Sequence, residues 1–292
     1  MSFNDFLSLF ISAILTAGLY ATMSYGLALI YGVMKIINLA HAGVMMLGAY
    51  MTFWLVTTLK LNPFLAPLLV VPTFFFLGTI LQRVLIRRIA GSPPIASLLL
   101  LFGVWLIMQN LAYLIFSGDT RSVFTEYTLL TIQVGGILLS VNRLVVFFVG
   151  VFALITLQLF LMRTDTGRAI RALAADADAA LLVGVNTNRV SAIAFGLGIA
   201  LASLAGSLMS LIFTFDPDFG RSHLLKSFSI VVLGGLESFV GVALGSIVLA
   251  LAEAFSVVWI KAALQDFISF GLLVVVLIVM PNGIMGLIKR KT

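Results

Sequence analysis

Residues 143–189, with the sequence RLVVFFVGVFALITLQLFLMRTDTGRAIRALAADADAALLVGVNTNR, contain the two features that decide the fold. Residues 143–162 form an apolar run, and about 20 such residues in a helix cross a hydrocarbon core of about 30 Å. The segment 163–189 that follows is a long polar interruption in an otherwise apolar chain. We therefore expect a membrane-spanning helix followed by a segment that lies outside the bilayer.

The composition extends this pattern to the whole chain. Of the 292 residues, 62% are hydrophobic and 10% are charged, and the mean hydropathy is +1.20. The runs predict helices near residues 7–32, 38–58, 64–86, 95–116, 143–162, 190–213, 242–259 and 267–288. The run 224–240, broken by Gly234 and Gly235, is either a ninth crossing or a re-entrant segment. We expect an all-α polytopic integral membrane protein with eight or nine transmembrane helices, forming a single domain over residues 1–292.

The basic residues predict the orientation, because Lys and Arg are retained on the cytoplasmic side of a membrane. With 163–189 inside, alternation places most loop Lys and Arg residues inside as well. The amino end then lies outside and the carboxyl end in the cytoplasm, which requires an odd number of crossings and favours nine. The excess of basic residues, 17 against 11 acidic ones, is therefore interpreted as a topology signal and not as a nucleic-acid site. No basic segment precedes the first apolar run, so we expect that helix to be retained.

Within 163–189 the sequence predicts two short helices that meet at an elbow. Thr164 and its neighbours offer oxygen acceptors for the free amides of a first helix. Asp176 can cap a second helix, and Gly184 can end it in a left-handed conformation.

One face of the first elbow helix is apolar. Ile170, Leu173 and Ala174 share this face at helical spacing, and Arg168 and Arg171 flank it. Such a helix suits a groove on a partner protein, or alternatively a surface of anionic lipid. The periodicity alone leaves both interpretations open.

A second polar island, at residues 31–43, separates the first two apolar runs. Polar groups at membrane depth are costly unless they face protein or a water-filled cavity, so Asn38 and His41 are candidates for a translocation path. In the alternative interpretation, Asn38 caps the second helix and His41 bonds the turn.

Three groups of residues resemble the branched-chain amino acid ABC permease family of the LivH type. The first comprises GLALIYGVM (26–34), INLAH (37–41) and MLGAY (46–50). The second comprises GRAIRA (167–172) with Asp176, Gly184 and Val190. The third is VLGGL (232–236) with Gly241 and Gly245. These groups cover nearly the whole chain, but Glu237 departs from the small residue that is usual in the family.

The resemblance implies the ABC importer permease fold, in which residues 166–183 correspond to the coupling helices, and so it favours the groove over the lipid surface. The coupling residues that it implies are Gly167, Arg168, Ile170, Arg171, Leu173, Asp176, Leu181 and Gly184. It further implies a sister permease subunit, two ABC ATPase subunits and an extracytoplasmic substrate-binding protein, assembled in a bacterial inner membrane and surrounded by lipid. Transport would proceed by alternating access.

The chain contains no Gly-x4-Gly-Lys-[Ser/Thr] phosphate loop. We therefore expect no cofactor on this chain, with ATP and magnesium on the partner ATPases. No catalytic triad, paired carboxylate or metal-ligand spacing is present in the sequence, which also lacks cysteine, so an enzyme or a metal site is not expected.

Further candidates come from charges and glycines. Glu253 lies in an apolar run and is interpreted as an ion or proton relay, a partner for a buried donor, or a snorkelling side chain. The path residues that we predict are Asn38, His41, Gly43, Gly234, Gly235, Glu237 and Glu253. A charged external loop contains Asp216 and Asp218 together with Arg221, His223 and Lys226. This loop could dock a binding protein, through Asp216, Asp218 and Arg221, or simply be solvated.

Other functions remain open at this point. An ABC permease for urea or short amides fits the same resemblance, since the external binding protein usually sets the specificity of such systems. An ion-coupled secondary transporter would use Glu253 or Glu237 as its relay, and a channel would not need residues 166–183. Residues 18–50 and 196–250 also share a weak internal symmetry, which is typical of transporters.

Overall fold

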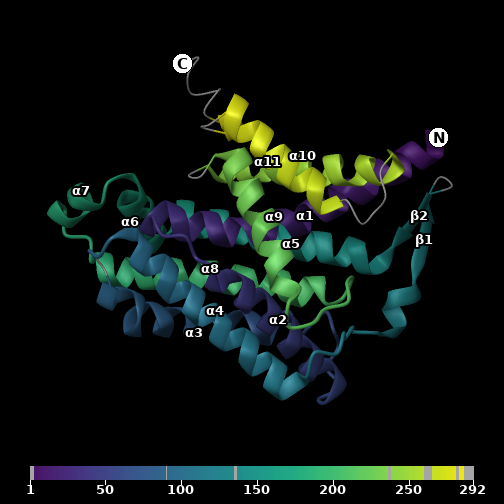
Figure 1. Ribbon diagram of the computed structural model, residues 1–292, viewed down its shortest axis with the longest axis horizontal. Helices are drawn as coiled ribbons and strands as arrows, with labels where there is room; N and C mark the ends of the chain where they lie inside the picture. Colours follow the sequence, from purple (N-terminus) through teal and green to yellow (C-terminus); the bar gives the residue numbers. More distant parts are fainter. Residues whose placement is uncertain are drawn as a thin grey trace.

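Figure 1 shows a computed structural model, which describes residues 3–89, 91–134, 137–235, 238–259, 265–280 and 283–285. Within these ranges, eight helical spans are long and apolar enough to cross a membrane. They correspond to the helices α1 (Phe3–Met34), α2 (Ala40–Thr57), α3 (Pro67–Val84), α4 (Pro94–Phe116), α5 (Val141–Arg163), α8 (Thr187–Met209), α10 (Phe239–Trp259) and α11 (Gln265–Val279). The predicted all-α membrane fold is confirmed, with helix ends displaced by a few residues.

The long helices run between two ends of the molecule (Figure 1). At one end, which we call the elbow end, lie α6 (Asp165–Ala175) and α7 (Ala177–Leu182). At the other, the hairpin end, strands β1 (Thr131–Val134) and β2 (Ile137–Ser140) form an antiparallel pair in which Thr131 faces Ser140. Two 3-10 helices, η1 (Ile86–Ile89) and η2 (Glu126–Leu129), follow α3 and precede β1. The sequence did not predict the hairpin.

Helix α8 forms the centre of the molecule, since 89% of its span is buried, compared with 11% for α4 and 22% for α5. Small residues explain this position, because they allow helix backbones to approach closely. A Cβ added to Gly206 of α8 would overlap the carbonyl group of Met45, and a Cβ on Gly48 of α2 would overlap that of Ser203. The outer helices α4 and α5 expose apolar side chains, as expected for surfaces in contact with lipid or another subunit.

Helix α2 begins deep inside the molecule and not at the elbow end, where α1 ends. Its first turn packs on the middle of α4, because a Cβ on Gly43 would touch Met108 and Trp105. The ring of His41 bonds Met23, which lies eleven residues before the end of α1 and hence about 16 Å from it along the helix axis. Residues 35–39 therefore lead the chain back into the membrane before α2 starts.

Helix α9 (Phe219–Gly234) replaces the predicted run 224–240. Its 16 residues span about 24 Å, less than the hydrocarbon core of about 30 Å. It also starts inside, because a Cβ on Gly220 would overlap the carbonyl group of Ala42 in the first turn of α2. In Figure 1, α9 crosses its neighbours steeply and ends beside the start of α10. The ambiguous run is thus a short ninth helix that enters from a buried start.

Candidate functional site

The elbow forms through the side-chain caps that the sequence predicted. Thr164 accepts a hydrogen bond from the amide of Gly167 at 3.0 Å, which caps α6. Asp176 accepts from the amides of Asp178 and Ala179, both at 3.0 Å, and so caps α7. Gly184 follows α7 with φ of 82°, a left-handed conformation that glycine adopts without strain. These three predictions are confirmed.

The apolar face of α6 lies against the protein itself and not on the surface, which corrects our expectation. Ile170 and Leu173 are 1% and 5% exposed, and α6 packs on α1, α5 and α8. The exposed apolar residues belong to α7 and its end: Leu181, Leu182 and Val183 are 55%, 89% and 78% exposed. The buried face therefore anchors the elbow, and α7 presents its apolar tip outward.

The charged residues of α6 differ in their partners. Arg168 forms a solvent-exposed ion pair with Asp165, one turn earlier on the same helix. Arg171 is also exposed, and among the described residues it has no carboxylate partner. Of the two arginines, Arg171 is the one available to a ligand or a partner.

The break before α2 is formed differently from the prediction. Lys35 has φ of 55° and ends α1 in a left-handed conformation, which redirects the chain. Asn38 does not cap α2, whose N-cap residue is Leu39 and has no side-chain hydrogen bond. His41 does not bond the turn either, since its Nε2 lies 2.9 Å from the carbonyl oxygen of Met23 in α1. The capping interpretation of this segment is therefore wrong.

Several polar atoms near this break are buried without a partner within the described ranges. They are both amide atoms of Asn38, Nδ1 of His41 and the hydroxyl oxygen of Ser24. All three residues are fully buried. Buried polar groups are nearly always hydrogen-bonded, and unpaired ones are costly at membrane depth, so these atoms are candidates for contact with water or a substrate.

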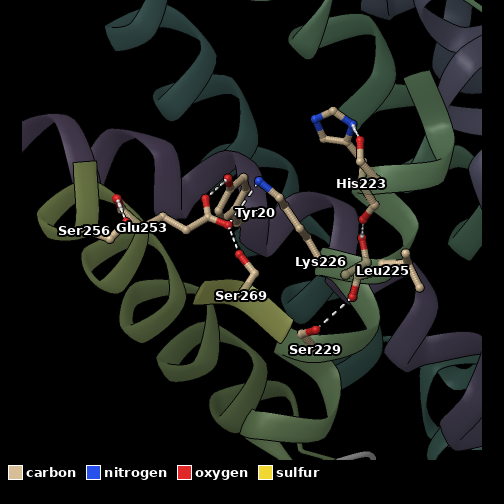
Figure 2. A network of polar contacts seen from close by, with 10 residues as sticks. Tyr20, His223, Leu225, Lys226, Ser229, Glu253, Ser256 and Ser269 are labelled. Atoms are coloured by element: carbon tan, nitrogen blue, oxygen red, sulfur yellow. Dashed lines mark hydrogen bonds and ion pairs between the residues drawn. The ribbon is translucent and has the colours of Figure 1, made fainter. Parts of the chain in front are cut away.

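A second polar cluster joins four helices (Figure 2). Lys226 of α9 and Glu253 of α10 form an ion pair, with 3.1 Å between Nζ and Oε1. The hydroxyl group of Tyr20 on α1 donates to Oε2 of Glu253, and that of Ser269 on α11 donates to Oε1. Lys226 is 8% exposed and Glu253 is 2% exposed. We call Lys226 and Glu253 the buried pair, and Tyr20 and Ser269 are its hydroxyl donors.

The buried pair corrects two expectations. Lys226 lies within α9 and not in an external loop, and Glu253 is buried and does not snorkel. The carboxylate accepts one ammonium and two hydroxyl donors, so of the interpretations for Glu253 the structure favours a partner for buried donors. Lys226, Tyr20 and Ser269 were not predicted as members of this cluster.

The glycines that we predicted for the path make packing contacts. A Cβ on Gly234 would overlap the backbone of Gly241, at the turn between α9 and α10. Gly235 has φ of 102° and lies against Gly283. Gly43 packs on α4, as described above. Glu237 lies outside the described residues.

The loop before α9 folds inward at the hairpin end. Both carboxylate oxygens of Asp218 accept hydrogen bonds from α4, one from Gln109 at 2.5 Å and one from Tyr113 at 2.6 Å. Asp216 accepts from the backbone amide of Asp218 at 2.9 Å. Arg221 lies exposed in the first turn of α9. Asp218 therefore holds the loop onto α4, Asp216 braces the turn within the loop, and Arg221 is left exposed.

Comparison with known proteins gives a consistent result over nearly the whole chain. A family model described as branched-chain amino acid transport system / permease component matches residues 9–277. The high-affinity branched-chain amino acid transport system permease protein LivH of Escherichia coli (strain K12) is 30% identical over 299 residues, covering 97% of this chain and 96% of the relative. The permease protein BraD of Pseudomonas aeruginosa is 30% identical over 297 residues, covering 96% of each. The permease protein LivM of Escherichia coli is 27% identical over 162 residues, 51% of this chain and 36% of the relative. No solved structure matches significantly.

Proposed function

The chain belongs to the family of branched-chain amino acid transport permeases, and on this premise we propose that it is one membrane subunit of an ATP-driven importer for branched-chain amino acids. The observation that carries the proposal is the family match over residues 9–277, together with relatives that align with this chain over 96% of their own length. It favours this function over a urea or amide permease and over an ion-coupled carrier. The buried pair supports the same choice, because Glu253 is already occupied by three donors.

The partners follow from the family. The partial similarity to LivM supports a sister permease of related sequence. Two ATPase subunits, with ATP and magnesium, would bind the elbow end, and a substrate-binding protein would dock at the hairpin end, where Arg221 is accessible and Asp216 and Asp218 shape the loop. In this arrangement the amino end would lie outside and the carboxyl end in the cytoplasm of a bacterial inner membrane, as the bias of basic residues also favours.

In this mechanism α7 is the contact point and α6 transmits the motion. The exposed residues Leu181, Leu182 and Val183 would fill an apolar groove on an ATPase. Ile170 and Leu173 would pass the displacement to α1, α5 and α8, on which α6 packs. Gly167 has a structural part in this joint, because a Cβ there would overlap the backbone of Phe160 and Leu161 in α5.

The translocation path would pass the break before α2. Both amide atoms of Asn38, Nδ1 of His41 and the hydroxyl oxygen of Ser24 are buried without a partner within the described residues. His41 lies in the first turn of α2, which touches the buried start of α9 at Ala42 and Gly220. A zwitterionic substrate offers donors and acceptors for such atoms. In the conformation described here they are closed off, as alternating access requires of one state.

Co-purification from native membranes tests the ATPase contact. We expect the wild-type chain to retain an ATPase, and Leu182→Asp to lose most of it because a carboxylate at the 89% exposed tip cannot be desolvated in an apolar groove. Asp178→Asn, an exposed change on the same helix, is the control and should retain the ATPase. Equal recovery with both variants would exclude the tip as the contact, and absence of an ATPase from the wild-type eluate would contradict the importer itself.

A second experiment separates a path role of Asn38 from a structural one. Asn38→Leu removes unpaired buried polar atoms, so the thermal stability of the complex should stay equal or rise while leucine uptake in proteoliposomes is lost. Thr52→Val is a matched control for a structural role, because the Thr52 hydroxyl donates to the Ser207 hydroxyl at 2.6 Å. Loss of this bond should lower the thermal stability of the complex without abolishing leucine uptake. Lowered stability of Asn38→Leu with normal uptake would show that the side chain is structural.

A further inference from the structure

A cavity of about 290 Å³ lies at the elbow end, between α1, α5, α6 and α10. Its wall is mostly apolar and comes from all four helices. The apolar residues that form it include Ala28, Leu29, Val33, Leu161, Ile170 and Phe239. The translocation path proposed above lies deeper in the membrane and shares none of these residues.

The polar groups at this cavity are complementary to a zwitterion. Arg171 of α6 lines it and has no carboxylate partner among the described residues, so its guanidinium can bind a carboxylate. Gly32 and Val33 also line it and belong to the last turn of α1, which ends at Met34. The last carbonyl groups of a helix lack partners within the helix and carry partial negative charge, which suits an ammonium group.

The size of the cavity favours a small ligand. Pockets for drug-sized molecules begin at about 300 Å³, so this volume suits one amino acid and cannot enclose a phospholipid. The apolar wall provides a place for a branched aliphatic side chain. A branched-chain amino acid therefore satisfies the charge, the polarity and the volume together.

We propose that this cavity binds the transported amino acid on the side to which it is delivered, and that the bound amino acid inhibits further transport. This inference rests on the proposed function of the chain. The ligand would bridge Arg171 on α6 and the end of α1, and so it would hold the elbow in one position relative to α1. Because α6 must move for ATP hydrolysis to drive transport, occupancy of the cavity slows the cycle.

The decisive variant is Gly32→Leu. A Cβ at Gly32 would meet no atom within 4 Å, so a leucine side chain can extend into the cavity without displacing the protein. Gly103→Leu is the matched control, because Gly103 lies in α4, away from the cavity, and a Cβ there also meets no atom within 4 Å. Arg171→Gln removes the guanidinium group that would bind the carboxylate of the amino acid. Arg168→Gln, on the same helix, is its control.

The test measures equilibrium binding of labelled leucine to the whole complex in nanodiscs without the external binding protein. The introduced side chain would occupy the space of the side chain of the bound amino acid. We expect Gly32→Leu to weaken binding at least tenfold, because burial of the ligand's leucine side chain supplies about that much affinity. Arg171→Gln should weaken it by a similar factor, and both controls should bind like the wild type. The binding protein is then added, saturated with leucine, and the ATPase activity of the complex is measured. Further free leucine should inhibit the activity of the wild type and of Gly103→Leu, but not that of Gly32→Leu.

Three results would overturn the inference. Unchanged leucine binding by Gly32→Leu would place the ligand elsewhere, for example at the break before α2. Phospholipid retained by the wild type and lost from Gly32→Leu would identify a lipid as the occupant. Leucine uptake by the intact system with no inhibition by free leucine would refute the inhibitory site and leave the proposed function intact. A lack of uptake with every binding protein tested would instead refute the proposed function.

Discussion

Removal of one member of the buried pair should damage the protein more than removal of both. Lys226→Met leaves the carboxylate of Glu253 buried with two hydroxyl donors, and Glu253→Leu leaves the ammonium of Lys226 buried without this acceptor. Breaking a buried ion pair from one side costs about 3–5 kcal/mol, whereas replacing both members with apolar groups is often neutral or stabilising. For the double variant we expect a loss of about 2 kcal/mol, because the hydroxyl groups of Tyr20 and Ser269 each lose an acceptor worth about 1 kcal/mol.

Thermal unfolding of the purified complex in nanodiscs measures this cycle. At about 2–4 °C per kcal/mol, each single variant should lower the melting temperature by roughly 6–20 °C, and the double variant should melt above both. Glu253→Gln keeps an acceptor for Tyr20 and Ser269, and so it separates the loss of charge from the loss of hydrogen bonds. If the double variant melts at the temperature that the two single losses predict when added, the two side chains are not energetically coupled and our account of the buried pair is wrong.

Two further predictions concern packing and capping. Gly206→Val should abolish recovery of folded protein, because its Cβ would overlap the carbonyl group of Met45. Gly103→Val is the control, since a Cβ there meets no atom within 4 Å, and it should be recovered normally. Equal yields of the two variants on size-exclusion chromatography would contradict this account. Asp176→Ala removes a cap worth about 1 kcal/mol from α7 alone. It should lower substrate-stimulated ATPase activity while the melting temperature changes by no more than about 4 °C. Asp178→Ala is the control, and equal activity of both variants would show that the cap does not affect coupling.

The sequence predicted those parts of the fold that depend on local pattern. Apolar runs of sufficient length gave the spans of α1, α4 and α5 to within a few residues at the helical ends. Local side-chain chemistry gave the elbow, because Thr164, Asp176 and Gly184 act on backbone groups within three or four residues of themselves. Such features need no knowledge of the tertiary structure.

Other features depend on contacts between distant segments, and these were missed or wrongly interpreted. Lys226 was predicted to lie in the external charged loop, but its partner Glu253 is 27 positions later in a different helix, and sequence spacing does not reveal such a pair. The spacing of Ser222, Lys226 and Ser229 along one helical face was the available signal. Likewise, the burial of Ile170 could not be predicted, since an apolar helix face has the same pattern whether it packs on its own chain or on a partner.

The weak internal symmetry noted in the sequence has a counterpart in the structure. In both segments a long helix, α1 or α8, is followed by a turn into the membrane and by a helix with a buried start, α2 or α9. From their buried starts the two helices lead to different ends of the molecule, as expected for inverted repeats: α2 leads to the hairpin end, and α9 leads to the start of α10, whose Phe239 lies beside α6 at the elbow end. The two starts touch at Ala42 and Gly220. A motion of either segment therefore has to pass through this contact.

Helix α1 connects this contact with the elbow. Tyr20 and Met23 lie three residues apart, about one helical turn, and they bond Glu253 and His41 respectively. The same helix packs on α6 near its end. A shift of α1 caused by the elbow must therefore change the geometry of the buried pair and of the break before α2 together. We therefore expect that perturbing the buried pair alters how strongly ATP binding changes the environment of His41.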